Sequence, residues 1–286
     1  MPSRAPTRAA TPPATRLRPV VRWNGGKTRL LKHLLPALPP HRTYVEAFGG
    51  GLALFLAKKP SPVEIINDLN TDLITLYRCA QFHLEPLLAE IQFTLTSRQN
   101  LADLRTQPGL TDLQRAARYL ILNRTSFGGA GTHYAVSKKT AQPSRAATLA
   151  TLRALNARLD KTSIENLPFE RLFKLYDSPQ TLWFLDPPYL DSDAAIYTGW
   201  NEAQMRHFHS EVSALQGPCL ITVDDSPLNR SLWAKDHLTE ITTRNGCTNQ
   251  RTHGNSSFKE LMIERRMQSP CKALKKPAQS HFKQAA

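Results

Sequence analysis

Short runs of apolar and β-branched residues alternate with helical patterns along most of this chain, and this alternation constrains the fold more than any other feature. Strands separated by helices need crossover connections, which are typical of a parallel sheet covered on both faces. We therefore predict an α/β fold with a doubly wound, mostly parallel sheet that binds ligands at the carboxyl ends of its strands. The predicted strands are Thr43–Phe48, Pro62–Ile66, Thr181–Leu185, Pro218–Val223, Leu238–Thr243 and Phe258–Ile263, the last two as an antiparallel edge pair. The predicted helices are Thr28–Leu35, Leu52–Lys58, Asp72–Ile91, Arg171–Tyr176 and Glu202–Leu215.

The stretch from residue 93 to residue 165 interrupts this alternation. Three helical patterns, Arg98–Arg105, Thr111–Leu122 and Arg145–Leu159, flank a glycine-rich, polar centre at residues 123–139. We interpret residues 93–165 as a helical insertion between two parts of one domain, residues 19–92 and 166–266.

Positive charge is concentrated in that insertion and at the two ends of the chain. The net charge is +14, and residues 98–166 alone hold eleven Lys or Arg against four acids. Residues 1–18 and 267–286 are basic, rich in Pro and Ala, and without hydrophobic periodicity, so we expect disordered tails. A basic segment beside a nearly neutral body favours a surface that faces nucleic acid. A solvated helical surface explains the charge equally well.

The most specific motif is Asp186-Pro187-Pro188-Tyr189, directly after the apolar run 182–185. Two prolines fix the backbone of the loop and leave its carbonyls free as hydrogen-bond acceptors. A carboxylate oxygen and a backbone carbonyl are suited to hold the two protons of an amino group, while the tyrosine stacks on the base that carries it. An acidic turn with no such role is the alternative interpretation of these four residues.

A second motif lies where the apolar run 44–48 meets Gly49-Gly50-Gly51 and a helical pattern. Glycines at a strand-to-helix turn let the backbone approach a nucleotide closely. Asp68 follows the next predicted strand at the separation expected for an acid that accepts hydrogen bonds from ribose hydroxyls. Together the two features predict a site for a cofactor with an adenosine moiety.

The third motif is Trp23-Asn24-Gly25-Gly26-Lys27-Thr28. Its Gly-Lys-Thr ending is similar to the end of a phosphate-binding P-loop, but that motif needs a glycine where Val21 stands and a strand leading into it. The P-loop interpretation therefore fails, and a helix-initiating turn with a packed tryptophan is the plainer alternative.

Taken in their order along the chain, the motifs resemble those of the Dam-type (D12 class) family of site-specific DNA adenine methyltransferases. Members carry W-x-G-G-K, then a strand ending in F-x-G-x-G, then N-D at a strand end, and D-P-P-Y after a target-recognition segment. These motifs match Trp23–Lys27, Phe48–Gly51, Asn67–Asp68 and Asp186–Tyr189, and the resemblance spans roughly residues 20–266. The chain has Ala47 where the family often has proline.

The resemblance implies an S-adenosylmethionine-dependent, Rossmann-like methyltransferase that modifies the exocyclic amino group of adenine. It implies that the cofactor is bound by Trp23, Lys27, Phe48, Gly49, Gly51, Asp68 and Asp186. It also implies that the target adenine is held by Asp186, Pro187, Pro188 and Tyr189. Because a duplex hides the amino group, the base must be flipped out of the helix.

Contacts with double-stranded DNA are expected from the 93–165 insertion, which the family uses for target recognition. The candidates are Arg124, His133, Tyr134, Lys138 and Lys139. Arg124 pairing with an acid of the catalytic body is an equally good interpretation. Gly128-Gly129-Ala130-Gly131 stands where the family often has Asn-Gly-Leu, so the family's sequence preference is not carried over. A cytosine amino group, RNA, or a catalytically silent DNA-binding role are the alternative functions.

The remaining expectations concern the setting of the protein. No run of about 18 apolar residues and no secretory signal is present, so we expect a cytoplasmic, nucleoid-associated protein of a bacterium or phage. Family members usually act as monomers, and no metal site is predicted.

Overall fold

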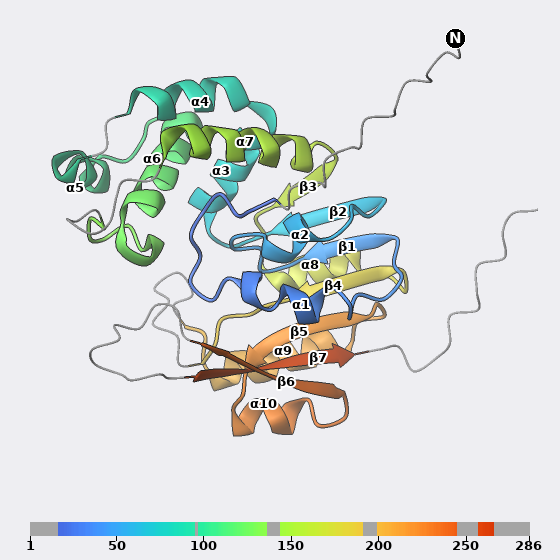
Figure 1. Ribbon diagram of the computed structural model, residues 1–286. Helices are drawn as coiled ribbons and strands as arrows, with labels where there is room; N and C mark the ends of the chain where they lie inside the picture. The colour runs from blue at the N-terminus through green and yellow to red at the C-terminus, as the bar shows by residue number, and fades with distance from the viewer. Residues whose placement is uncertain (1–16, 95–96, 136–143, 191–198, 245–256, 266–286) are drawn as a thin grey trace, which may run out of the picture.

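A seven-stranded sheet with the order β3-β2-β1-β4-β5-β7-β6 forms the centre of the molecule (Figure 1). The computed structural model describes residues 17–94, 97–135, 144–190, 199–244 and 257–265. Strands β1 to β5 are parallel, and β7 runs antiparallel to both β5 and β6. This order confirms the predicted doubly wound sheet, whose direction of winding reverses between β1 and β4. The strands are β1 (Thr43–Glu46), β2 (Val63–Asn67), β3 (Thr162–Glu165), β4 (Thr181–Leu185), β5 (Cys219–Asp224), β6 (His237–Arg244) and β7 (Ser257–Arg265).

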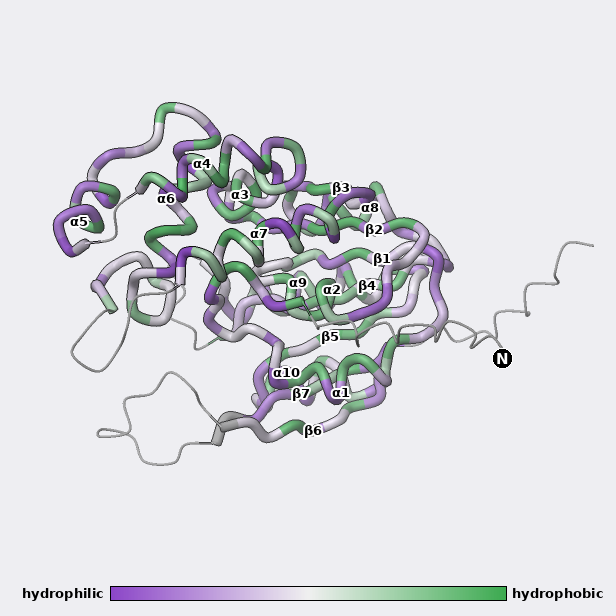
Figure 2. Tube along the Cα trace, turned by 45° about the horizontal axis from the view of Figure 1, so that its top comes forward, coloured by the Kyte–Doolittle hydropathy of each residue, from purple (hydrophilic) through white to green (hydrophobic). Residues whose placement is uncertain are grey.

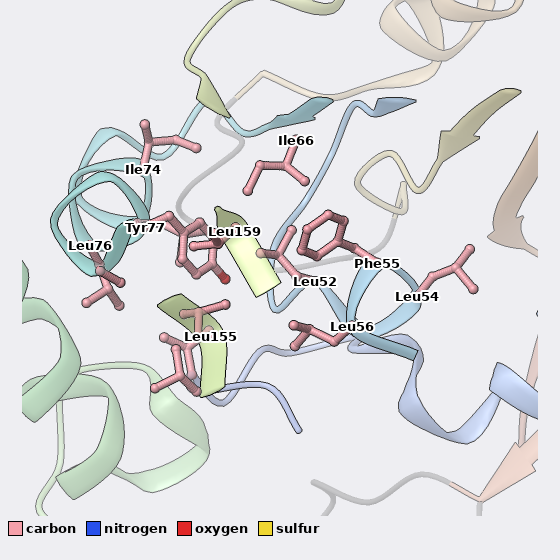
Figure 3. Packing of buried hydrophobic residues seen from close by; sticks show 14 of the residues in the cluster. Leu52, Leu54, Phe55, Leu56, Ile66, Ile74, Leu76, Tyr77, Leu155 and Leu159 are labelled. Atoms are coloured by element: carbon pink, nitrogen blue, oxygen red, sulfur yellow. The ribbon is translucent and has the colours of Figure 1, made fainter. Parts of the chain in front are cut away.

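Helices cover both faces of the sheet because its central strands are apolar on both sides. Neighbouring residues of a strand point to opposite faces, so Tyr44 belongs to one buried cluster and Val45 to the other. The first cluster packs under α1 (Leu31–Leu34), α2 (Ala53–Ala57), α3 (Thr71–Phe82) and α7 (Arg145–Leu159), as Figure 3 shows for Phe55, Tyr77 and Leu155. The second packs against α8 (Phe169–Tyr176), α9 (Glu202–Ser213) and the residues around α10 (Pro227–Leu232).

The helices between β2 and β3 form a layer beside the β2–β3 edge (Figure 1). They include α4 (Leu84–Phe93), α5 (Arg98–Thr106) and α6 (Asp112–Thr125), and α6 packs on α3 and α4. Helix α7 contacts α3, and β3 pairs with β2 as the edge strand. The predicted range 93–165 therefore includes strand β3, which is part of the sheet, and helix α7, which packs on α3. Strand β3 was not predicted, because this edge strand has only one apolar residue, Ile164, among polar neighbours.

Most other predicted elements are present, with three differences. The predicted helix Asp72–Ile91 is two helices, since His83, at φ −131° and ψ 43°, breaks it between α3 and α4. The predicted helix at residues 28–35 is a 3-10 turn, η1 (Lys27–Arg29), followed by α1. Helix α10 was not predicted; it begins at Pro227 after the N-cap Ser226.

Several sequence predictions concern residues outside the described part of the chain. Almost all of both basic tails belongs there, as do Lys138 and Lys139. Within the described residues, apolar and polar stretches alternate along the helices that flank the sheet (Figure 2). None of the described helices is both long and apolar enough to cross a membrane.

Candidate active site

The carboxyl ends of β1, β2, β4 and β5 bring three of the predicted motifs to one edge of the sheet. The glycine turn follows β1, Asp68 follows β2, and Asp186 follows β4. Lys27 and Trp23 reach the same edge from the segment before α1, as their contacts below show. The sheet therefore assembles side chains that are more than 150 residues apart in sequence.

The turn after β1 has no room for side chains at its first two glycines. A Cβ atom on Gly50 would lie 2.5 Å from Nε1 of Trp23, and one on Gly49 would lie 2.9 Å from the Asn67 carbonyl oxygen. Gly50 also has a φ of +45°, which L-residues rarely adopt. The Trp23 ring thus lies directly against the backbone of the turn. The absence of side chains at these glycines is thus what allows Trp23 to pack on the turn.

Asp68 is buried and fixes the glycine turn from the end of β2. Its Oδ2 accepts a hydrogen bond from the Gly50 amide at 2.8 Å, and its Oδ1 accepts one from the Asn70 amide at 2.8 Å. Asn67 adds a bond from Nδ2 to the Ala47 carbonyl at 2.8 Å. Both oxygens of the Asp68 carboxylate therefore hold backbone amides at the carboxyl end of β2.

Asp186 forms a buried ion pair with Lys27 at the mouth of β4. Nζ of Lys27 lies 2.8 Å from Oδ1 of Asp186 and also donates to the Gly25 carbonyl at 2.7 Å. The Thr222 hydroxyl donates to the same Oδ1 at 2.7 Å. Within the described residues, no hydrogen bond or ion pair ends on the other oxygen, Oδ2, and 18% of the side chain is exposed. Asp186 is therefore fixed through Oδ1, while Oδ2 is available to accept a hydrogen bond.

Opposing effects set the protonation of this pair. Burial raises the pKa of Asp186, while the charge and hydrogen bond of Lys27 and the hydrogen bond of Thr222 counteract it. Lys27 is 4% exposed, so water screens its positive charge only weakly and its electrostatic effect on Asp186 is strong. The ion pair keeps an acceptor available at a buried strand end.

Tyr189 and the two prolines complete the loop after β4. Pro187 and Pro188 are buried and Tyr189 is half-buried. Nζ of Lys27 lies 4.9 Å from the centre of the Tyr189 ring, within the range of a cation–π contact. Burial, followed by the nearby carboxylates of Asp186, Glu260 and Asp224, raises the pKa of the Tyr189 phenol well above its ordinary value. Tyr189 therefore stays neutral beside three acids.

Two of those acids were not among the predicted site residues. Glu260 is on β7 and 5% exposed, and Asp224 is its register partner at the end of β5. Burial, with a contribution from Asp186 and an opposing one from Lys27, raises the pKa of Glu260 to about 7. Glu260 and Lys259 are both charged residues of the predicted strand Phe258–Ile263, so no local pattern separated Glu260 from a surface acid. Asp224 follows its apolar strand just as Asp186 follows β4.

The glycine-rich centre of the predicted insertion forms a short hairpin next to the Trp23 segment. Ser126 and Tyr134 form an antiparallel bridge, and the Phe127 amide donates to the His133 carbonyl at 2.8 Å. Asn123 ties this hairpin to Arg22: its Oδ1 accepts from the Arg22 amide at 2.7 Å, and its Nδ2 donates to the Arg22 carbonyl at 2.7 Å. The hairpin and the predicted cofactor site are therefore linked through the residue before Trp23.

The predicted DNA contacts differ in their accessibility. His133 is exposed, and Tyr134 is half-buried with the Arg98 guanidinium 5.2 Å from its ring centre. Arg124 instead points inward, where its Nη1 donates to the Val20 carbonyl at 3.2 Å, and burial lowers its pKa. Within the described residues, the hydrogen-bond partner of Arg124 is thus a backbone carbonyl, and no acid forms an ion pair with it. Phe127 was not among the predicted contacts; it lies next to the Ser126–Tyr134 bridge and is 63% exposed.

Comparisons with known proteins agree on one chemistry. A family model described as D12 class N6 adenine-specific DNA methyltransferase matches residues 23–246. Type II methyltransferase M1.LlaDCHI of Lactococcus lactis subsp. cremoris is 26% identical, over 80% of this chain and 90% of the relative. The DNA N-6-adenine-methyltransferase of Escherichia phage P1 is 33% identical over 43% of this chain, but this match spans 17% of that protein. Retron Ec67 DNA adenine methylase of Escherichia coli is 24% identical, over 75% of this chain and 80% of the relative.

Proposed function

This chain belongs to the D12 class N6 adenine-specific DNA methyltransferase family, and on that premise we propose that it methylates a flipped-out adenine with S-adenosylmethionine as the donor. The observation that carries the proposal is the Asp186 carboxylate, gripped through Oδ1 by Lys27 and Thr222 with Oδ2 open. A hydrogen-bond acceptor fixed in this way at the end of β4 is suited to bind an amino group.

The residues at the sheet edge fit the proposed donor. S-adenosylmethionine supplies an electrophilic methyl group on a sulfonium when it is bound. The glycine turn lets the Trp23 ring pack directly on its backbone, and we assign the adenosine part to the site that this ring and the turn border. Asp68 is positioned for the ribose hydroxyls, while Trp23, Phe48 and the Lys27–Asp186 pair border the rest of the site. In this proposal Gly49 and Gly51 shape the turn.

Asp186 and the loop after it would prepare the adenine amino group for attack. The lone pair of this nitrogen is delocalised into the ring, so the nitrogen is a weak nucleophile. Hydrogen bonds accepted by Asp186 Oδ2 and the Pro187 carbonyl return electron density to it and hold it in line, while Pro188 keeps the loop rigid. Positioning and preorganised electrostatics of this kind contribute much of an enzyme's acceleration. Tyr189 compensates the stacking that the base loses when it leaves the duplex.

The DNA-facing part would be narrower than residues 93–165. Helix α7 and β3 pack with the sheet, so we assign DNA recognition to α5, α6 and the hairpin that follows. Exposed Arg98, Arg105 and His133 are available for phosphates or base edges, with Tyr134 beside them. The exposed ring of Phe127 is available to stack on a base. Lys138 and Lys139, outside the described residues, remain proposed phosphate contacts.

The test is methyl transfer from labelled S-adenosylmethionine to unmethylated duplex DNA, with the product located by modification-sensitive sequencing. We expect N6-methyladenine at one repeated sequence, and a loss of at least about 10²-fold in rate for Asp186→Ala. Asp160→Asn, which changes an exposed acid at the end of α7, serves as the matched control and should behave as wild type. Methylcytosine, transfer to RNA alone, or an active Asp186→Ala variant would contradict the proposal.

A further inference from the structure

We propose that Glu260 is a second catalytic carboxylate, the final acceptor of the proton that the adenine amino nitrogen releases during methyl transfer. This inference rests on the proposed function and adds a step to it. Glu260 lies within the stretch that resembles the family but outside the four motifs matched to the cofactor and base sites, and its carboxyl group is otherwise unexplained by the fold.

The register of the sheet brings Glu260 to the Asp186 site. In the antiparallel pair of β5 and β7, Thr222 is opposite Met262 and Asp224 is opposite Glu260. Opposite residues, and residues two apart on one strand, point to the same face of a sheet. Glu260 therefore shares a face with Thr222, whose hydroxyl binds Asp186. On this face, the Asp224–Glu260 pair is the next pair after Thr222–Met262 toward the carboxyl end of β5, where the proposed ligand site lies.

Burial without a partner distinguishes Glu260 from a structural acid. The residue is 5% exposed, and within the described chain its Oε2 is buried with no hydrogen-bond partner. Oδ1 of Asp224, directly across the strands, is also buried without a partner. Like charges directly opposite in a sheet destabilise it. A proton on one of the two carboxylates relieves that repulsion, so this pair is arranged to gain a proton.

The groups that face Glu260 are Lys27 from η1, Asp186 and Tyr189 from the loop after β4, and Asp224 from β5. On β6 its register partner is apolar Ile241. The pKa of Glu260 is raised to about 7 by burial and by the Asp186 charge, against the effect of Lys27. A carboxyl group with a pKa near the working pH both takes up and releases a proton readily.

The proton balance of the reaction requires an acceptor. Methylation forms a nitrogen–carbon bond and breaks the methyl–sulfur bond, whose electron pair stays on the donor sulfur. The amino nitrogen then carries one proton too many, and its N–H bond breaks with the electron pair returning to nitrogen. Burial raises the pKa of Asp186, but its Oδ1 is occupied by Lys27 and Thr222, and Lys27 opposes its protonation through both its charge and its hydrogen bond. Ionised Glu260 takes the proton and becomes a neutral carboxylic acid, which later gives it to water.

The experiment compares wild type, Glu260→Gln and Glu260→Asp in single-turnover methyl transfer between pH 5.5 and 8.5, with the enzyme saturated by donor and DNA. For wild type we expect a rate that rises with pH, with its midpoint near the pKa of Glu260, and then reaches a plateau. Glu260→Gln should be slower by about 10²-fold and lose the rising limb. Glu260→Asp should keep the limb at a reduced rate. Donor affinity, measured by calorimetry, should be unchanged in both variants.

Different outcomes would separate this inference from the function it rests on. A Glu260→Gln variant with the wild-type plateau rate and the same pH limb would overturn it. So would a pair of variants that lose donor affinity in parallel with rate, because that marks a structural role. Glu260→Asp keeps the question answerable if Glu260→Gln does not fold. Wild-type enzyme without activity on any DNA would instead refute the proposed function itself.

Discussion

Lys27 is the residue on which most of the site's electrostatics depend. Its ammonium contacts the Gly25 carbonyl, the Asp186 carboxylate and the Tyr189 ring, and it is buried. Sequence alone identified Lys27 and Asp186 as site residues through the family resemblance. Their direct ion pair could not be predicted, because it depends on how the segment before α1 crosses the carboxyl end of β4.

Lys27→Met keeps the length of the side chain and removes its charge. Asp186 then has no cation to oppose the effect of burial, so its pKa rises further and it is protonated at a higher pH. Methyl transfer should fall by about 10²-fold at neutral pH and recover partly as the pH rises. The measurement is the single-turnover rate against pH. Lys59→Met, at an exposed lysine after α2, should leave the profile unchanged; equal profiles for all three proteins would refute the role of Lys27.

Gly50→Ala tests the contact between the glycine turn and Trp23. The added methyl group would lie 2.5 Å from the indole nitrogen, so the ring must move away. We expect donor affinity to drop by at least about tenfold, about 1.4 kcal/mol, together with a change in Trp23 fluorescence. Gly128→Ala is the matched control, since Gly128 also has a positive φ, +61°, but open space around it. Equal losses of donor affinity in both variants would assign the effect to backbone strain alone.

At the scale of elements, the sequence was informative where one signal dominated. Strand β4 was predicted with its observed bounds because five consecutive residues are buried on both faces. Helix α7 was also predicted with its observed bounds, and Ser144 caps it by accepting from the Ala147 amide. Strand β3 and the break at His83 were missed, since both depend on neighbours distant in sequence. The position of Glu260 opposite Asp224 likewise follows from strand register, which no local pattern reveals.

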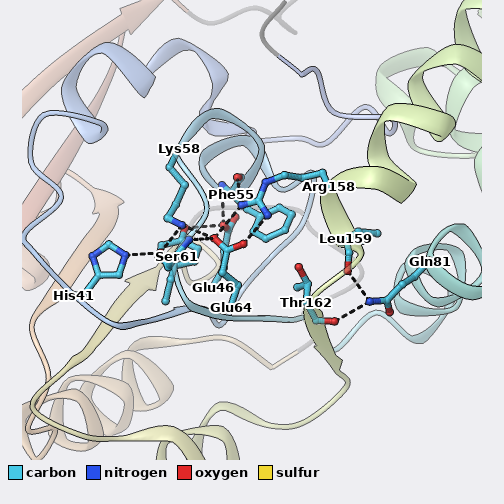
Figure 4. Close-up of polar contacts among 11 residues, drawn as sticks. His41, Glu46, Phe55, Lys58, Ser61, Glu64, Gln81, Arg158, Leu159 and Thr162 are labelled. Carbon is cyan, nitrogen blue, oxygen red and sulfur yellow. Dashed lines mark hydrogen bonds and ion pairs between the residues drawn. The ribbon is translucent and has the colours of Figure 1, made fainter. Parts of the chain in front are cut away.

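A buried charge cluster joins α7 and α2 to β2 (Figure 4). Arg158 donates to Oε2 of Glu64 at 2.5 Å and to Oε1 at 2.9 Å, and Lys58 lies 2.5 Å from Oε1. Burial alone would raise the pKa of Glu64, but the hydrogen bonds from Arg158 and Lys58 hold it below its ordinary value. Nearby Glu46 differs: burial raises its pKa to about 8, against the hydrogen bonds from Tyr44 and the Phe55 amide.

The two buried glutamates should therefore lose very different amounts of stability on replacement by glutamine. Glu64→Gln leaves two buried cations without their anion and should lower the free energy of unfolding by about 3–5 kcal/mol. Glu46→Gln should cost far less, since a neutral side chain already suits that position. Because the folded-state pKa of Glu46 is raised, wild type loses stability as pH rises from 4.5 to about 8, and Glu46→Gln should flatten that part of the curve. Urea unfolding at several pH values measures both effects; equal costs and slopes would contradict this account.

At the scale of the whole molecule, Asn123 connects the hairpin that we propose to face DNA with the segment that we propose to face the donor. It is 4% exposed and holds both backbone groups of Arg22, while its Nδ2 also donates to the Gly129 carbonyl at 3.1 Å. The two functional regions thus share a buried side chain between α6 and the segment that carries Trp23. We expect DNA and methyl donor to influence each other's affinity through this link.

Asn123→Asp keeps the acceptor for the Arg22 amide and removes both donated hydrogen bonds. The ratio of donor dissociation constants with and without DNA should move toward one, because binding at either region then has less effect on the other. Calorimetry with a DNA duplex that is already methylated at its target adenines, so that no transfer occurs, measures this ratio. Asn156→Asp is the control, since Asn156 also donates to two carbonyls, those of Ala80 and Gln81, but far from both regions. An unchanged ratio in Asn123→Asp, or equal changes in both variants, would refute the link.

The segment from Arg22 to Lys27 is anchored at both ends, by Asn123 at one and by Asp186 at the other. An enzyme that stays on a long DNA between reactions must exchange its spent donor while the hairpin still engages the duplex. In the proposed assignment the hairpin faces DNA and the other end of this segment faces the donor, and Gly25, at φ +74°, followed by Gly26 is the part of the segment whose backbone is least restricted. We expect side chains at these two positions to lower the processivity, the number of sites modified in one encounter with DNA, without removing a contact to a base or a phosphate.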